Sequence, residues 1–389
     1  MIATDYSGLK TGSPMQKMWG DLTTAFERRN PHIKVEVQLI PIGQADAQVA
    51  EQVKDGDAPD IAQLDSYSAF ADKDQLYTAD ELFPISQQSE FIPSLAEAGS
   101  VNRVHYGIPW VASTRMFFYN KKLFAHAGIH NAPQTWDDVK RDAVKLKADG
   151  VKVPIALPLG PQEAEAESMM WMLGNGGGYT NMVGAYTLDS ARNISAFNWL
   201  KNNLVDAGLV GPKDPATTSV SDAFGDFLSG RAAMLNGHLT LLPRAKAAGI
   251  DVGVAPLPGR TEPSAQTLGN ADWMMAFKQK GNLDADAKFL QYVYSESNML
   301  KFQEQYKLLP VTADVADVIR TNPAYHDLVP FMSLLAEAAF PPVNKTSWGE
   351  VSQDWKKAIG QAVHGDPARI LGNLERSATA ADSGSGSGG

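Results

Sequence analysis

Few residues of this sequence lie at the spacings that an enzyme mechanism would need. It contains no G-x-S-x-G nucleophile elbow, no phosphate-binding G-x-x-x-x-G-K-[ST] loop and no H-E-x-x-H zinc helix. It also contains no cysteine, which excludes a thiol nucleophile, thiolate-ligated zinc and iron–sulfur clusters. We therefore predict a protein that is not an enzyme and that needs neither a metal ion nor another cofactor.

Two polar clusters have weak metal-binding or catalytic interpretations. His126 and His130 are four residues apart, but a glycine between them ends the helix, so we expect solvated histidines in a loop. Glu163, Glu165 and Glu167 could supply the paired carboxylates of a glycosidase. Their alternate spacing puts them on different faces of a helix, and we predict an exposed first turn that the helix macrodipole stabilises.

The tryptophans are a stronger indication of function. Trp110, Trp273 and Trp348 each lie at the edge of an element, beside proline or polar residues. A sugar site needs this combination, because the apolar face of a pyranose stacks on an aromatic ring while polar side chains bind its hydroxyl groups. The alternative, in which each ring packs at the edge of a domain, stays open. Trp19 and Trp199 fall on apolar helical stripes and are expected in the core.

Alternating strands and helices must position these residues. Residues 33–42 alternate as a strand, while Ser13-Pro14 and Thr135 with Asp138 mark the starts of helices. Further short apolar strands are expected at residues 60–64, 116–120, 153–157, 232–236, 251–256 and 273–277, between helical stretches. This interleaving predicts an α/β fold with largely parallel sheets.

Length and charge narrow the class of partner. The 389 residues correspond to two or three domains, and the formal net charge of −10 argues against nucleic acid or an anionic membrane surface as the main partner. No stretch approaches the ~18 uninterrupted apolar residues of a membrane span. Residues 1–4 resemble the end of a strand, and residues 383–389 contain only serine and glycine. We interpret these ends as a start left by removal of an export signal and as an appended flexible linker.

Five motifs occur in the order and at the spacing of a known family. They are Ala25-Phe26-Glu27 with Asn30-Pro31 and Ile33–Val37, then Gly56–Ile61, then Tyr106–Trp110 with Phe118–Lys121 and Leu123-Phe124, then Gly128, Pro133 and Thr135–Asp138, and finally Phe227 with Gly230, Ala232–Met234 and Asn236-Gly237. Together they cover about residues 3–380. The ordered set resembles the family 1 extracellular solute-binding proteins, which are receptors of ATP-driven importers.

The resemblance implies a two-lobe periplasmic-binding-protein fold of type II. Each lobe would be a mostly parallel sheet flanked by helices, with the ligand in a cleft between the lobes. The N-terminal lobe would comprise residues 1–112 and 268–310, and the C-terminal lobe residues 113–267 and 311–382. A ligand that contacts both lobes would favour the closed state of the hinge.

The resemblance also implies particular site residues. The matching positions are Asp5, Tyr6, Asp65, Trp110, Arg115, Asn236, Gly237, Asp272, Trp273 and Trp348. Open α/β sheets bind ligands at the carboxyl ends of their strands, where Asp5, Asp65 and Asn236 are expected. Leu239 and Ser66 depart from the pattern of the maltose-binding members, which argues against a maltodextrin ligand.

The function that the resemblance implies is capture of a mono- or oligosaccharide and its delivery to the permease subunits of an ABC importer. It implies a monomer in the periplasm, or one anchored to the outer face of a membrane. An anionic solute such as a glycerol phosphoester is an alternative ligand, with Arg115, Arg231 and Arg244 as candidate cations. A glycoside-acting enzyme that uses Asp65 and Asp272 is a third possibility.

Overall fold

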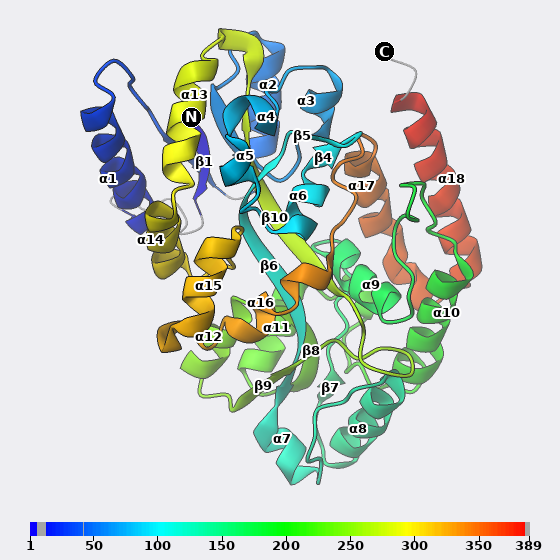
Figure 1. Cartoon of the computed structure of the whole chain (residues 1–389). Helices are drawn as coiled ribbons and strands as arrows, with labels where there is room; N and C mark the ends of the chain where they lie inside the picture. Colours follow the sequence, from blue (N-terminus) through cyan, green and yellow to red (C-terminus); the bar gives the residue numbers. More distant parts are fainter. Residues whose placement is uncertain (6–12, 42, 386–389) are drawn as a thin grey trace. The chain divides into compact units, whose positions relative to one another are not determined.

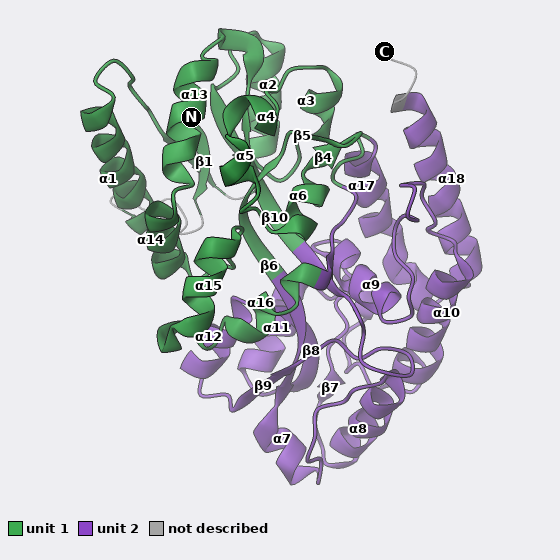
Figure 2. Cartoon of the chain, in the orientation of Figure 1, with its two compact units in different colours: residues 1–113, 270–336, 343–346 green, residues 114–269, 337–342, 347–389 purple. Residues whose placement is uncertain are grey.

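The computed structural model describes residues 1–5, 13–41 and 43–385, and its strands and helices alternate along much of the chain (Figure 1). The chain forms two compact units (Figure 2). Unit 1 comprises residues 1–113, 270–336 and 343–346, and unit 2 comprises residues 114–269, 337–342 and 347–389. Both units combine strands with covering helices, so the predicted α/β fold is confirmed.

The sheet of unit 1 has four neighbouring strands. Their order is β2 (Gln38–Pro41), β1 (Ile2–Asp5), β3 (Ile61–Leu64) and the later part of β10 (Thr267–Ala276). Strand β1 runs parallel to β2 and β3, whereas β10 runs antiparallel to β3. The unit also contains β4 (Ser100–Val101), β5 (Val104–His105) and the start of β6 (Ile108–Asn120).

Ten α-helices of unit 1 lie in the part of the chain that the structure describes. They are α1 (Pro14–Arg29), α2 (Ala45–Lys54), α3 (Ser68–Asp72), α4 (Ala79–Leu82), α5 (Ile85–Gln88), α6 (Pro93–Ala98), α13 (Leu283–Val293), α14 (Glu296–Tyr306), α15 (Ala313–Thr321) and α16 (Val329–Met332). Helix α1 begins as the sequence predicts, because the Ser13 hydroxyl accepts a hydrogen bond from the Gln16 N–H at 3.1 Å and proline follows it.

Unit 2 is built around the later part of β6. Strand β6 runs antiparallel to β8 (Ala232–His238) and β9 (Val252–Ala255), β7 (Val153–Ile155) runs parallel to β8, and β11 (Ala338–Ala339) pairs with the start of β10. Its helices are α7 (Lys121–His126), α8 (Trp136–Ala148), α9 (Ala164–Leu173), α10 (Ala191–Leu200), α11 (Val220–Leu228), α12 (Leu241–Ala247), α17 (Trp348–Ala358) and α18 (Pro367–Ser385). The predicted capping box of Thr135 and Asp138 is present at the start of α8.

The chain passes from one unit to the other inside two long strands. The divisions fall between residues 113 and 114 within β6 and between residues 269 and 270 within β10. The chain passes between the units again after residues 336, 342 and 346. The units are therefore assembled from interleaved segments, and continuous strand rather than a flexible linker joins them at the first two passages.

Residues 311–336 differ from the sequence-based lobe assignment, which placed them in the C-terminal lobe. In the structure they belong to unit 1. The backbone explains this, because the N–H of Ile92 donates to the Val311 carbonyl at 3.0 Å and the N–H of Ala313 donates to the Glu90 carbonyl at 2.7 Å. The apolar face of α15, with Val315 and Ile319, is buried. The crossing expected near residue 310 is replaced by passages between residues 336 and 347.

The end of the described chain also differs from expectation. Helix α18 continues to Ser385, whereas the sequence predicted a flexible linker at residues 383–389, of which 386–389 lie outside the described residues. Serine and glycine are poor helix formers, but the preceding turns of α18 supply carbonyl acceptors, and the Ser383 hydroxyl donates to the Thr379 carbonyl at 2.8 Å. Within the described residues, no helix combines the length and the apolar character needed to cross a bilayer.

Candidate functional site

Three of the predicted carboxylates come together at one edge of the sheet of unit 1. Asp5 ends β1, Asp65 follows β3, and Asp272 lies in β10. The pairing of Ile2 with Ala62 places Asp5 level with Asp65, and the pairing of Trp273 with Leu64 places Asp272 opposite Asp65. The edge is formed by the carboxyl ends of β1 and β3, which is where open α/β sheets bind ligands.

A buried glutamine that no sequence motif marks holds this edge together. The Gln63 amide donates from Nε2 to Oδ2 of Asp272 at 2.7 Å, and its Oε1 accepts from the backbone N–H of Thr4 at 3.1 Å. Gln63 therefore connects all three strands. The sequence did not mark Gln63 as part of a site, because a glutamine at that position of a strand could equally face solvent.

Helix α2 fixes the loop that carries Asp65. The Asp46 carboxylate, in the first turn of α2, accepts from the backbone N–H groups of Asp65 at 3.2 Å and of Ser66 at 3.1 Å. Burial raises the pKa of Asp46, while these two hydrogen bonds oppose the shift. The Asp65 side chain is exposed beyond this anchored backbone. The result is a preorganised, solvent-accessible carboxylate.

Asp5 lies deeper, with 2 % of its surface exposed. Tyr306, at the end of α14, is close enough to feel its charge: burial first and then the Asp5 carboxylate raise the pKa of the Tyr306 phenol to about 12. The phenol therefore keeps its proton at neutral pH and remains a potential hydrogen-bond donor. Tyr6, which the resemblance also assigns to the site, lies outside the described residues.

Trp110 and Trp273 are packed inside unit 1, each with 1 % of its surface exposed. The Trp110 ring lies 5.6 Å from the Trp19 ring and 4.7 Å from the Phe302 ring, between centroids. The Trp273 ring lies 5.5 Å from the Tyr67 ring. Of the two interpretations left open by the sequence, these contacts correspond to packing, since protein rings occupy the positions that a sugar would need.

Arg115 is a buried cation on β6 in unit 2, with 8 % of its surface exposed. Its Nη2 donates to Oε2 of Glu163 at 3.1 Å. Its backbone carbonyl accepts from the Thr267 hydroxyl at 2.6 Å, which ties β6 to β10. Arg115 is therefore held in place from both its side chain and its backbone.

The acidic turn at the start of α9 is not the exposed, solvated turn that the sequence suggested. Glu167 is buried, with 2 % of its surface exposed, and its Oε1 accepts from Trp171 Nε1 at 2.7 Å and from Asn236 Nδ2 at 2.9 Å. Glu165 pairs with Lys356 at 3.1 Å. Alternate residues on a helix face different directions, and here one of those directions is the interior of unit 2.

We expect Glu167→Gln to make the stability of the protein less dependent on pH. Burial raises the pKa of Glu167 from 4.5 to about 7. The folded state therefore binds more protons than the unfolded state between pH 4.5 and about 7, so stability falls as pH rises through that window. Glutamine stays neutral and keeps an oxygen for Trp171 and Asn236.

Urea unfolding at pH 5 and pH 8 would check this expectation. The urea midpoint of the variant minus the urea midpoint of the wild type should be larger at pH 8 than at pH 5. An unchanged difference between the two pH values would show that Glu167 ionises normally in the folded protein.

Asn236 and Gly237, at the carboxyl end of β8, act within the structure of unit 2. Asn236 holds the buried carboxyl of Glu167. A Cβ atom added at Gly237 would lie 2.8 Å from the Phe118 ring, so glycine is needed there for the close approach of that ring. Trp348 begins α17, and its ring packs 4.8 Å from that of Tyr179. Their assignment to ligand binding stays a prediction.

The predicted loop histidines show no metal arrangement. Nδ1 of His126 pairs with Oδ2 of Asp149 at 2.5 Å, and the Asp149 carboxylate raises the pKa of the exposed imidazole. Among the described residues, no three histidine, aspartate or glutamate side chains converge as metal ligands.

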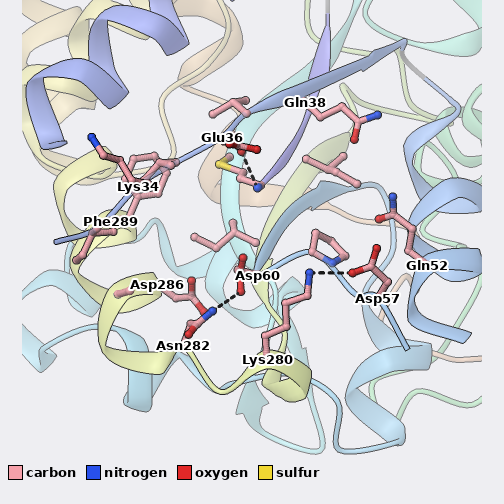
Figure 3. A pocket seen from close by; sticks show the side chains of 18 residues that line it. Lys34, Glu36, Gln38, Gln52, Asp57, Asp60, Lys280, Asn282, Asp286 and Phe289 are labelled. Carbon is pink, nitrogen blue, oxygen red and sulfur yellow. Dashed lines mark hydrogen bonds and ion pairs between the residues drawn. The ribbon is translucent and has the colours of Figure 1, made fainter. Parts of the chain in front are cut away.

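A cavity of about 800 Å³ lies at the opposite edge of the unit 1 sheet, by the amino ends of β1 and β3 (Figure 3). Asp57 and Lys280 form an ion pair of 3.0 Å in its wall, and Asn282 donates to Asp60 at 2.8 Å. Burial, with the neighbouring Asp60 charge, raises the pKa of Asp286 to about 7. The cavity is separate from the edge that carries Asp65 and Asp272.

The chain thus combines two α/β units that each carry polar side chains near strand ends. The sequence profile described as "Bacterial extracellular solute-binding protein" matches residues 7–300. The chain belongs to this family.

Two similar proteins cover different shares of the chain. A Brucella abortus (strain 2308) protein, whose name gives binding as its role, is 26 % identical over 396 residues, covering 95 % of this chain and 90 % of the relative. The sn-glycerol-3-phosphate-binding periplasmic protein of Escherichia coli K12 is 24 % identical over 254 residues, covering 61 % of this chain and 56 % of that protein.

Solved structures share the fold. The cyclic alpha-maltosyl-1,6-maltose binding protein of Arthrobacter globiformis has a TM-score of 0.81 at 18 % identity, covering 98 % of this chain and 97 % of its own. The sugar-binding protein MalE of Xanthomonas citri has a TM-score of 0.81 at 20 % identity, with the same coverage. These matches confirm the predicted two-lobe binding-protein fold.

Proposed function

We propose that this chain is the sugar receptor of an ATP-driven importer. Ligand binding favours the closed state of the hinge, and the sugar then passes to the permease subunits. The protein acts as a non-catalytic monomer in the periplasm or anchored outside a membrane. The observation that carries the choice of a sugar is the row of carboxylates formed by Asp5, Asp65 and Asp272.

Carboxylates favour a polyhydroxylated ligand over a phosphoester in unit 1. An ionised carboxylate only accepts hydrogen bonds, and sugar hydroxyls supply donors in several directions. Such charge-assisted hydrogen bonds are shorter and stronger than neutral ones. A phosphate group brought to the same edge would meet like charges, which disfavours it.

One of the three cations considered for an anionic ligand is engaged elsewhere. Arg231, which precedes β8, pairs with Asp226 at 2.5 Å, at the opposite end of that strand from Asn236. It therefore does not join Arg115 and Arg244 near the carboxyl end of β8. This arrangement weakens the phosphoester alternative.

The proposal predicts that a saccharide raises the thermal unfolding midpoint of the protein. A ligand that binds only the folded state stabilises it by mass action, by about 2.7 kcal/mol at a hundredfold excess over the dissociation constant. A thermal-shift screen over neutral mono- and oligosaccharides would measure this, and small-angle X-ray scattering with the best sugar should show a smaller radius of gyration.

The other two candidate functions give different results in the same screen. A shift by glycerol phosphoesters with none by any saccharide would replace the sugar receptor by a phosphoester receptor. Turnover of glycosides that Asp65→Asn abolishes would instead establish an enzyme.

A further inference from the structure

Three nitrogen-bearing side chains meet near the carboxyl end of β8, and we call Arg115, His238 and Arg244 the basic corner of unit 2. Arg115 and His238 are directly paired residues of antiparallel β6 and β8, so their side chains leave the sheet on the same face. The Phe224 ring of α11 lies 4.9 Å from the His238 ring, and the Arg244 guanidinium lies 5.9 Å from the Phe224 ring.

The basic corner has an unused capacity for hydrogen bonding. Arg115 gives Nη2 to Glu163, but its buried Nε has no hydrogen-bond partner among the described residues. Arg244, exposed on α12, forms no ion pair within the described part of the chain. The His238 ring uses Nδ1 for the Thr240 hydroxyl at 2.7 Å.

The charges of two guanidinium groups act on His238 in the basic corner. Burial first, and then the Arg115 and Arg244 charges, lower the pKa of His238 to about 3. The histidine is thus neutral at physiological pH, because burial and, after it, the two guanidinium groups disfavour its charged form. Glu163 neutralises part of the Arg115 charge. Burial raises the pKa of Glu167 to about 7, so near neutral pH this carboxyl carries only part of a negative charge against the guanidinium groups.

We propose that the basic corner binds an oxyanion carried by the sugar, so that the ligand is an acidic saccharide with a carboxylate or phosphate group. This inference rests on the proposed sugar-receptor function and narrows its ligand class. Within the basic corner, Arg244 and the Nε of Arg115, which is unpartnered among the described residues, donate to the oxyanion. Guanidinium groups suit this role because their planar array of donors matches carboxylate and phosphate oxygens.

Matched neutral and acidic sugars test the charge preference. Glucose, glucuronate and glucose 6-phosphate, together with galactose and galacturonate, are compared by isothermal titration calorimetry with the wild-type protein. At least one acidic sugar should bind about tenfold tighter than its neutral partner, the size of one charge-assisted hydrogen bond. Whether the uronates or the phosphate give the stronger binding identifies the source of the oxyanion.

Arg244→Gln tests the assignment to the basic corner, since this exposed residue can be changed without opening the core. The variant should lose about tenfold in affinity for the acidic sugar and keep its affinity for the neutral one. Arg231→Gln is the matched control, because it removes the same charge near the other end of β8 and should change neither affinity.

The outcomes separate this inference from the proposed function. If neutral sugars bind as tightly as their acidic partners, or Arg244→Gln weakens both equally, the oxyanion site is wrong while the sugar receptor stands. If no neutral or acidic saccharide binds, the proposed function fails and the oxyanion site fails with it.

Discussion

Replacing Trp273 by alanine should lower the free energy of unfolding by about 3–5 kcal/mol, the range for truncating a large buried aromatic side chain. The ring is enclosed within unit 1 beside Tyr67. It also fills the space over two glycines, because a Cβ added at Gly99 or at Gly107 would lie 3.1 Å from it. The alanine variant would leave a cavity that this surrounding backbone closes only in part. Urea unfolding followed by circular dichroism would measure the loss.

Trp273→Phe is the matched control for this prediction. The indole Nε1 is buried without a hydrogen-bond partner among the described residues, so phenylalanine loses no hydrogen bond and keeps most of the packing. It should therefore cost much less stability than alanine. If Trp273→Ala instead left stability unchanged and weakened sugar binding, the ring would belong to the ligand site, as the sequence first suggested.

Asp65→Ala should weaken sugar binding by about 10- to 150-fold. This range corresponds to about 1.5–3 kcal/mol for a hydrogen bond to a charged group. The backbone N–H groups of Asp65 and Ser66 are held by Asp46, so the loop should keep its conformation after the change. Isothermal titration calorimetry with the best saccharide from the thermal-shift screen would measure the affinity, and urea unfolding would check the stability.

Asp72→Ala provides the control for Asp65. Asp72 is also an exposed aspartate of unit 1 and ends helix α3, the next helix along the chain. Its replacement should leave both the affinity and the stability within experimental error, since exposed substitutions usually change stability by less than about 0.5 kcal/mol. Equal losses in the two variants would mean that general negative charge, not Asp65, attracts the ligand.

Local features of this fold could be predicted because the residues that determine them are neighbours in the sequence. Ser13 caps α1, and Thr135 with Asp138 caps α8, since each cap needs only side chains and N–H groups within one turn. The site aspartates Asp5, Asp65 and Asp272 were instead predicted from the resemblance to the solute-binding proteins, which the strand-end rule supports for Asp5 and Asp65. A short apolar strand that ends in aspartate places that aspartate at the carboxyl edge of a parallel sheet.

Burial within a unit could not be predicted, because it depends on distant segments. Trp110 is covered by Trp19 and Phe302, which lie far from it on both sides in the sequence. Glu167 is buried because Asn236, on another strand, supplies a donor that makes its position tolerable. Spacing within one helix shows where a side chain can point, but not what lies opposite.

The interleaved segments also set the order in which the units can be completed during synthesis. Unit 1 gains its antiparallel strand β10 only after residue 276, and α13 to α15 follow from residue 283 onward. A chain stopped after residue 346 would hold every segment of unit 1, whereas unit 2 would still lack α17 and α18. Domains generally fold as units while the chain emerges. Unit 2, although most of its strands are made earlier, is therefore the later of the two to reach its full set of packing partners.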